Sequence, residues 1–260
     1  MTPFNKSKRR DFLAKTLLGV SSLPLTGCSQ IADTAWGQSI LHGVEVLTRY
    51  AQRQFLSPNA LAPEYAESDL SPVFKANGSQ NPDDETFQAL AARNFSDYRL
   101  EIDGLVERPA KLSLTELRAR PWREQITRHD CVEGWSCIGK WKGARLGELV
   151  GSTGLKSNAR YVVLHCFDSL ENSLDGSGIY YESIDLVDTF HPQTILAYEM
   201  NGIDLPLAHG APLRLRVERQ LGYKMAKYIR RIEVVESLSG LGRGKGGFWE
   251  DRGYEWYAGI

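Results

Sequence analysis

Short segments that alternate apolar and polar residues, each bounded by a turn, constrain the fold of this chain most. Tyr98–Gly104 alternates and then turns, as a half-buried strand does. Tyr161–Cys166 and Tyr228–Val235 are further strand-like segments, and Ile195–Gly202 enters an Asn-Gly turn. Helical patterns occur between these segments. The sequence therefore predicts a domain in which strands dominate and helices are inserted.

Local signals predict two helices and one irregular segment. Within Ser39–Phe55, apolar residues recur near the helical period, at Ile40, Val44, Leu47 and Ala51. Ser113–Glu116 is a capping box that starts a short helix, which Pro121 terminates. Because prolines break regular structure between residues 56 and 86, we expect an extended polar segment there.

Composition sets outer limits on function. The chain has 260 residues and is 42% hydrophobic, which suits a globular protein with a substantial core. Its formal net charge is −1, so nothing indicates a general nucleic-acid or acidic-membrane binder. Any site for an anion must be local.

The first residues have the layout of an export signal. Basic residues precede a modestly apolar run, Phe12–Leu25, which is too short to span a membrane. The segment from Lys8 to Lys15 is similar to the twin-arginine export motif, although a basic solvated tail is the alternative. The run ends at Cys28 in a stretch that looks like a lipoprotein acylation box. A four-residue match is easily accidental, so cleavage elsewhere to a soluble periplasmic protein stays open.

Cys131 is the candidate reactive residue. Its neighbours Arg128 and His129 are cationic or can become so, and we expect them to lower the pKa of the thiol and favour a metal-binding thiolate. The alternative is a buried cysteine that acts as a small hydrophobe. A structural zinc site needs about four protein ligands, and the sequence has no CxxC pair or HxxxH run to supply them.

Two motifs carry a resemblance to a known family. Cys131-Val132-Glu133-Gly134-Trp135-Ser136 resembles the molybdenum-ligating loop of the sulfite-oxidase-fold molybdopterin oxidoreductases. It is closest to the bacterial periplasmic branch that includes protein-methionine-sulfoxide reductases. His209-Gly210-Ala211-Pro212-Leu213-Arg214 is similar to the family segment that precedes the binding site of the cofactor phosphate.

The resemblance implies a molybdenum–molybdopterin cofactor, with Cys131 as the catalytic residue and the only protein ligand of the metal. It implies that further residues bind the pterin and its phosphate: Asn77, Cys166, His209, Arg214, Lys224, Met225, Ala226 and Lys227. A disulfide between Cys131 and Cys137 is conceivable in an oxidising compartment, but it would remove the metal ligand.

Several of these positions have alternative interpretations. Asn77-Gly78 suits a tight turn as well as a ligand. Arg214 and Arg216 share one face of a strand, which suits an exposed basic face. Cys166 stands where the reductase branch has a threonine, so it either touches the pterin or fills the core. His209 matches sulfite oxidases, whereas the reductase branch commonly has asparagine there.

The family likeness also predicts the architecture. We expect an α+β catalytic domain of mixed, mostly antiparallel sheets with peripheral helices, no dimerisation domain, and a monomer. The expected organisation has four parts: an export signal over 1–28, a helix and extended wrapping segment over 29–86, a molybdopterin-binding core over 87–236, and a glycine-rich, aromatic strap over 237–260.

The segment Asp168–Asp188 is rich in Ser, Gly and acids, and it reads as a long loop over the site or as an excursion at the edge of a sheet. Its members proposed for the substrate mouth are Asp168, Glu171, Tyr180 and Tyr181. Sulfite oxidases hold their anion with an arginine pattern that is absent after Cys131.

Reduction of S- or N-oxides is therefore favoured over oxidation of sulfite. A separate partner, either a membrane haem protein or a soluble cytochrome, is expected to supply the electrons. The rival from another class is a cofactor-free periplasmic binding or scaffold protein. An organic-cofactor enzyme lacks support because no GxGxxG follows a strand and opens a helix.

Overall fold

The computed structural model describes residues 34–55, 57, 59–171, 173 and 176–260. Its contacts separate two units, 1–51 and 52–260. In the first unit, the described residues form most of helix α3 (Ala35–Phe55), which confirms the helix expected from Ser39 and starts it earlier. The expected export signal and Cys28 lie outside the described residues. Within the described part of the chain, no helix is both long and apolar enough to cross a membrane.

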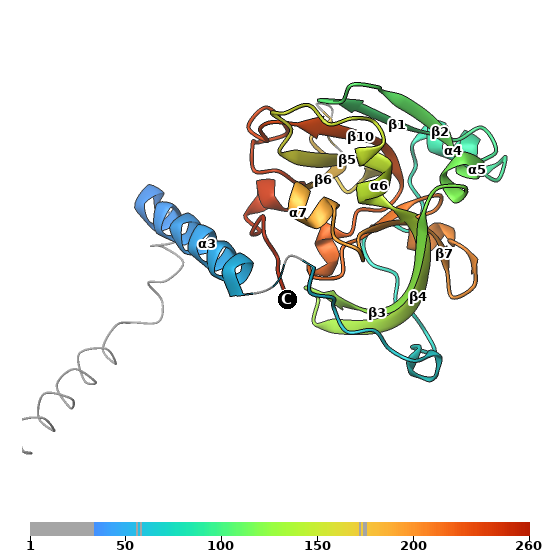
Figure 1. Cartoon of the computed structure of the whole chain (residues 1–260), viewed down its shortest axis with the longest axis horizontal. Coiled ribbons are helices and arrows are strands. Elements are labelled where there is room, and N and C mark those ends of the chain that lie inside the picture. Colours follow the sequence, from blue (N-terminus) through green and yellow to red (C-terminus); the bar gives the residue numbers. More distant parts are fainter. Residues whose placement is uncertain (1–33, 56, 58, 172, 174–175) are drawn as a thin grey trace, which may run out of the picture. The chain divides into compact units, whose positions relative to one another are not determined.

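Two five-stranded sheets build the second unit (Figure 1). The strand order of the first sheet is β2-β1-β10-β5-β6, with β1 and β10 parallel and the other pairs antiparallel. Its strands are β1 (Arg99–Gly104), β2 (Ala110–Ser113), β5 (Tyr161–Ser169), β6 (Ile179–Asp185) and β10 (Ile229–Val235).

The second sheet is antiparallel throughout, in the order β3-β4-β7-β8, and β9 also pairs with β7. Its strands are β3 (Trp122–Cys131), β4 (Trp135–Arg145), β7 (Ile195–Met200), β8 (Ile203–Asp204) and β9 (Arg214–Arg216). The long β3–β4 hairpin ends at Cys131, which pairs with Trp135 across the turn.

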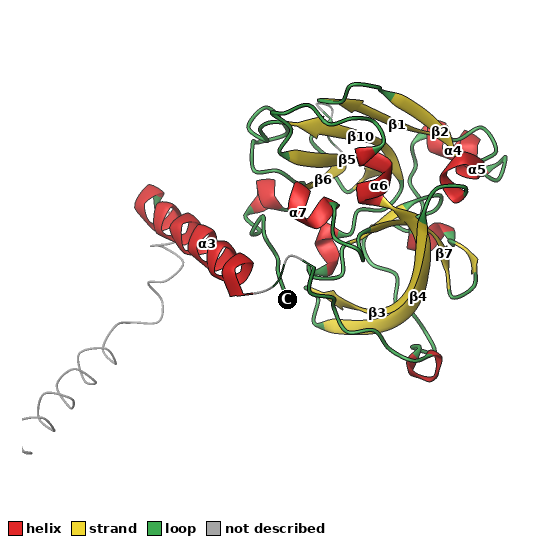
Figure 2. Cartoon of the chain, viewed as in Figure 1, coloured by secondary structure: helices red, strands yellow, loops and turns green. Residues whose placement is uncertain are grey.

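The helices of the second unit are short and lie around the sheets (Figure 2). They are α4 (Glu85–Ala91), α5 (Leu114–Arg118), α6 (Leu146–Gly151), α7 (Leu186–Thr189) and the 3-10 turns η2 (Glu67–Asp69), η3 (Leu207–His209), η4 (Gly222–Lys224) and η5 (Glu250–Arg252). The expected capping box of α5 is confirmed, because Ser113 and Glu116 each accept a hydrogen bond from the other's backbone N–H. Mixed sheets with peripheral helices confirm the α+β class.

The main core lies on the first sheet and is formed by the apolar faces of its strands. Leu100, Val162, Leu164, Ile232 and Val234 are at most 1% exposed in the expected alternating pattern. Burying each such side chain contributes about 1.5–3 kcal/mol. A smaller core around Phe74 and Trp141 lies on the second sheet.

Two of the alternative interpretations in this unit are wrong. Asp168–Asp188 is not a long loop, because β6 and most of α7 lie within it. The other alternative, an excursion at a sheet edge, fits, because β6 is the edge strand of the first sheet. The interior positions of β6 include the polar residues Glu182 and Ser183, both 0% exposed, so the apolar alternation that marks a strand is missing. The basic face of β9 is not exposed either, because Arg214 and Arg216 are both fully buried.

Candidate functional site

Cys131 is presented at the tip of the β3–β4 hairpin. The turn after it is closed by the Gly134 N–H, which donates to the Cys131 carbonyl at 3.0 Å. Gly134 has a φ of 84°, a left-handed conformation that glycine adopts without strain. The Cys131 thiol is half-buried, and Cys131, Cys137 and Cys166 are all free among the described residues. No disulfide removes the predicted ligand.

A pocket of about 260 Å³ lies beside this thiol, and six separate segments of the chain line it. Its lining residues are Asn77, Gly78, Ser79, Cys131, Val132, Glu133, Asp168, Leu170, Tyr180, Gly222, Tyr223, Met225, Lys227, Trp249 and Tyr254. The pocket therefore brings together Asn77, Cys131, Met225 and Lys227 from the predicted site.

The neighbours of Cys131 do not activate it as expected. Burial raises the pKa of the Cys131 thiol above its usual range. The Arg128 guanidinium instead donates to Asp130 at 2.9 Å, and the His129 pKa is well below its usual range because the ring is buried and faces cations. A bound metal would have to displace the thiol proton itself, as metals do with coordinating thiols.

His129 on β3 packs against the chain segment that carries Met225. Its Nδ1 accepts from Arg216 at 3.0 Å and lies 3.2 Å from the Met225 sulfur. Gly222 permits this close packing, because a Cβ there would lie 2.5 Å from the imidazole ring. The segment that carries Met225 is thereby held against the strand that ends at Cys131.

Arg214 is a buried cation with unused donors. Its guanidinium lies over the Trp141 ring at 4.9 Å and donates one hydrogen bond, from Nη1 to the His209 carbonyl at 3.0 Å. Its Nε and Nη2 have no hydrogen-bond partner among the described residues. Burial lowers the pKa of Arg214 to about 9. Since unpaired buried charges are costly, this side chain fits an anionic group such as a phosphate.

Lys227 adjoins Arg214 and lines the pocket. Gly210 packs between them, because a Cβ on it would lie 2.9 Å from the Lys227 side chain and 3.3 Å from that of Arg214. The Lys227 ammonium donates to the carbonyls of Asn77 at 2.6 Å, Ser79 and Ala208. Burial, followed by repulsion from Arg214, lowers the pKa of Lys227 to about 7. The same causes lower the pKa of His209 to about 4.

The remaining predicted cofactor residues lie behind the pocket wall. Lys224 is fully buried and donates to Glu182 and, at 2.6 Å, to Glu250, so its ammonium is already paired with two carboxylates. Cys166 lies in the main core, where burial raises its pKa well above the usual range. Ala226 is buried and its carbonyl accepts from the Leu215 N–H at 2.8 Å.

The extended segment supplies Asn77 to the pocket. The segment lies alongside the β3–β4 hairpin. Glu64 forms a β-bridge with Thr127, and the Ser71 N–H donates to the Ile138 carbonyl. Gly78 has a φ of 58° and lies at a bend of the chain, next to the candidate ligand. The structure therefore places a change of chain direction and a pocket position at the same two residues.

Two of the four predicted mouth residues line this pocket, Asp168 and Tyr180. Glu171 instead forms an ion pair with Arg252. The Tyr181 hydroxyl donates to Asp251 at 2.7 Å, and this ring lines a different cavity of about 510 Å³.

The sequence did not single out Tyr223, Trp249 and Tyr254, although all three line the pocket. The signal available for the latter two was the aromatic tail after the glycine-rich run, which indicates only that the rings need burial.

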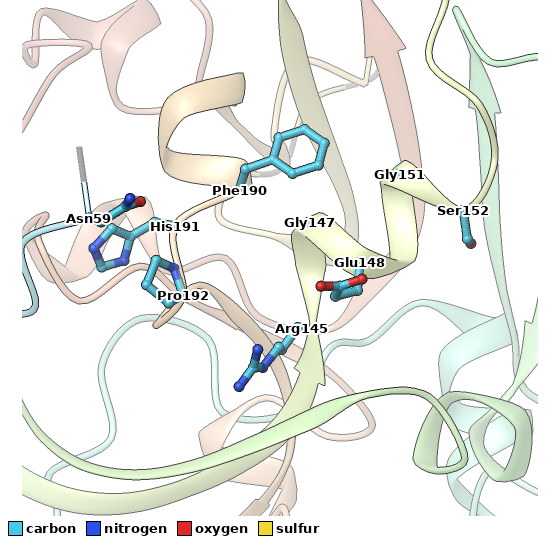
Figure 3. Close-up of a pocket in the computed structure, with 9 residues that line it drawn as sticks. All are labelled: Asn59, Arg145, Gly147, Glu148, Gly151, Ser152, Phe190, His191 and Pro192. Carbon is cyan, nitrogen blue, oxygen red and sulfur yellow. The ribbon is translucent and has the colours of Figure 1, made fainter.

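A larger cavity of about 770 Å³ contains none of these groups (Figure 3). Arg145, Glu148, Phe190, His191 and Pro192 surround it, without a thiol or any predicted cofactor residue. The smaller pocket beside Cys131 is therefore the candidate redox site.

Comparisons with known proteins identify the family of the chain. Residues 88–240 match the family described as the oxidoreductase molybdopterin binding domain. The putative protein-methionine-sulfoxide reductase subunit YedZ1 of Azospira oryzae is 39% identical over 96% of this chain and 87% of that protein.

The protein-methionine-sulfoxide reductase catalytic subunit MsrP of Xanthomonas campestris pv. campestris is 36% identical over 60% of this chain. The match spans 51% of that relative, about half of its length. Among solved structures, the sulfane dehydrogenase SoxCD of Paracoccus pantotrophus has a TM-score of 0.48 at 22% identity, covering 55% of this chain and 39% of that one.

A half-buried thiol, a buried arginine with unused donors and a matching family model lead to one conclusion. The chain belongs to the family of molybdopterin-binding oxidoreductases, and its cofactor is molybdenum–molybdopterin.

Proposed function

We propose that this chain is the catalytic subunit of a reductase that removes oxygen from S-oxides, methionine sulfoxide among them, and from N-oxides. The names of two relatives, YedZ1 and MsrP, support methionine sulfoxide as a substrate. Reduction of a sulfoxide takes up two protons and two electrons and releases a sulfide and water. The pocket must therefore accept a neutral substrate and supply protons.

The charges around Cys131 are the observation that carries this proposal. Lys75, beside the hairpin tip, pairs with Glu133 at 3.3 Å, and Trp135 donates to the same carboxylate at 2.8 Å. The pocket lining then contains two acids, Glu133 and Asp168, and one cation, Lys227. Glu133 is paired with Lys75, and Lys227 already donates to three backbone carbonyls, so the described lining offers the sulfite anion no free cation, whereas a neutral sulfoxide needs none.

When bound, the cofactor supplies a metal that accepts an oxygen atom and exchanges electrons. The protein positions this metal and tunes its reactivity. Cys131 would provide the thiolate ligand. Asn77, Met225 and Lys227, which line the pocket, would hold the pterin. Arg214, with its unused donors, would bind the phosphate bidentately. The Lys224 ammonium is held by Glu182 and Glu250, which supports a structural role for it rather than a direct contact with the cofactor.

Asp168 is the pocket group suited to hold a proton for the substrate oxygen. Its side chain is 3% exposed, and Oδ1 has no hydrogen-bond partner among the described residues. Burial raises the pKa of Asp168 to about 7, so a large fraction is protonated near neutral pH. A group whose pKa lies near the working pH is an effective general acid.

The location and the electron source complete the proposal. The signal-like first 28 residues and their twin-arginine pattern support export to the periplasm, with a lipid anchor at Cys28 as a further element. The relative YedZ1 is named as a subunit, which supports a separate electron-transfer partner, either a membrane haem protein or a cytochrome.

The deciding experiment uses the full chain made in a host that synthesises molybdopterin. We expect about one molybdenum per chain by elemental analysis, and turnover of sulfoxides and N-oxides with a reduced dye. The Cys131→Ser variant should lose turnover and the thiolate-to-metal absorption, because the metal loses its protein ligand. Cys137→Ser is the matched control, since Cys137 is a free thiol that does not line the pocket.

Two results would contradict the proposal. Oxidation of sulfite with an oxidised acceptor, without reduction of any oxide, would identify a sulfite oxidase instead. Purification without molybdenum from a competent host would identify a cofactor-free binding protein.

A further inference from the structure

Aromatic rings form a continuous part of the pocket wall. Tyr180, Tyr223, Trp249 and Tyr254 all line it together with Cys131. Trp249 and Tyr254 come from the C-terminal segment, which follows β10 in the chain and is drawn in red in Figure 1.

Contacts with other rings hold this wall in place. Trp249 and Tyr254 stack at 5.2 Å, and Tyr254 meets the Tyr223 ring edge-on at 5.1 Å. Behind them, Phe248 is 1% exposed and packs edge-on against Trp249 at 5.2 Å. The Phe248 N–H donates to the Tyr181 carbonyl on β6 at 3.0 Å. The rings are thus preorganised, which lowers the entropy cost of binding a ligand.

The pocket is chemically divided. Polar groups that suit the cofactor come from the extended segment and from Lys227, whereas Val132, Leu170, Trp249 and Tyr254 contribute apolar surface. Tyr254 remains 40% exposed, so the apolar part is open to solvent rather than sealed into the core. A sulfoxide has a matching division, with a polar S–O bond and apolar groups on sulfur. Aromatic rings bind such groups by burial and by sulfur–ring contacts.

We infer that Trp249 and Tyr254 bind the apolar group of the sulfoxide and make the enzyme select substrates by the size of that group. The inference rests on the proposed function and assigns the C-terminal rings to substrate rather than to cofactor. An enzyme with this wall discriminates between sulfoxides that share the same S–O bond and differ only in their apolar part.

The test compares dimethyl sulfoxide with methyl phenyl sulfoxide, using the molybdenum-loaded full chain and a reduced dye. We expect kcat/KM to be higher for the phenyl compound in the unaltered protein. In Trp249→Leu, we expect the ratio of the two kcat/KM values to fall by about tenfold, mainly through KM. Trp249→Phe, which keeps a ring, should restore much of the ratio. Calorimetric titration with methyl phenyl sulfone, an unreactive analogue, should show Kd rising about tenfold in Trp249→Leu.

Trp256→Leu is the matched control, because Trp256 belongs to the same segment but packs on Tyr161 and does not line the pocket. It should keep the ratio of the unaltered protein. An equal fall in this control would assign the effect to loosening of the segment and overturn the inference. Loss of molybdenum from Trp249→Leu would also overturn the inference, because it would show that the Trp249 ring contacts the cofactor. An unchanged ratio would refute the role of Trp249 while leaving sulfoxide reduction intact, whereas failure of the unaltered protein on every sulfoxide would refute the proposed function itself.

Discussion

Arg214 and Arg216 are adjacent on one face of β9, yet they differ in what they need. Both stack on Trp141, but Arg216 is paired with the buried Glu218 at 2.5 Å. Arg214 has no carboxylate partner among the described residues and keeps two unused nitrogens. One arginine is therefore structural, whereas the other is suited to an added anion.

Substituting each arginine by methionine should separate these roles. We expect Arg214→Met to lower retained molybdenum by tenfold or more, since a charge-assisted hydrogen bond contributes about 1.5–3 kcal/mol. The cofactor-free form of the same variant should be more stable than the unaltered one, because an unpaired buried charge is gone. Elemental analysis and urea unfolding measure the two effects.

Arg216→Met should instead destabilise even the cofactor-free form by about 3–5 kcal/mol, because it leaves Glu218 unpaired. Full molybdenum in Arg214→Met would contradict the assignment.

The sequence indicated which residues lie near one another at the site, but it did not indicate how their charges interact. The motifs placed Cys131 and Lys227 in one pocket correctly. The expected activation of Cys131 by Arg128 and His129 was wrong. Arg128, three residues before Cys131, lies on the other face of the strand. His129 shares the face of Cys131, but burial and nearby cations lower its pKa and disfavour the charged form. One of them reaches Asp130 and the other is buried against Met225. Proximity in sequence does not report distance between side chains here.

At the scale of elements, Lys224 connects three of them. It lies in η4, and its ammonium donates to Glu182 on β6 and to Glu250 in η5. Burial and the nearby Glu250 raise the pKa of Glu182 well above its usual range, and the Lys224 ammonium opposes this shift. The cluster ties the C-terminal segment to the segment that carries Met225 and Lys227.

Removing the cation should therefore release the C-terminal segment. We expect Lys224→Met to lower the free energy of unfolding by about 3–5 kcal/mol at pH 8. The loss should be smaller at pH 5, where protonation relieves the stranded carboxylates. Arg252→Ala, which breaks a partly exposed pair with Glu171, should cost less than about 1 kcal/mol. Proteolysis within residues 237–260 and urea unfolding provide the measurements, and equal losses in both variants would argue against a special role for the cluster.

Elements fixed by local signals were predicted, and those fixed by distant partners were not. The capping box at Ser113 and the alternation of β1 need no partner to be recognised. β6 was missed because its buried Glu182 is compensated by Lys224, which is far away in the sequence. A polar residue in a strand interior cannot be interpreted until its partner is known.

At the scale of the whole molecule, the cofactor-free protein holds positive groups that lack an anion. Burial lowers the pKa of Lys227 to about 7, below its unfolded value near 10.5. Between these values the unfolded state binds more protons, so stability rises with pH.

We expect the free energy of unfolding of the cofactor-free protein to increase by about 2–3 kcal/mol from pH 7 to pH 9. Urea unfolding at both pH values measures this change. Lys227→Met should flatten the increase, and the molybdenum-loaded protein should show less of it because its anion stabilises the charged form. An increase of the same size in Lys227→Met would assign it to other groups.

The pocket walls come from distant parts of the chain, since Asn77 and Tyr254 both line it. A ribosome releases the first of these residues long before the last. The pocket is therefore incomplete throughout most of translation. The residues assigned to the cofactor, up to Lys227, emerge before the rings assigned to the substrate, up to Tyr254. Binding of the cofactor is thus a late step, and the substrate part of the pocket is completed last.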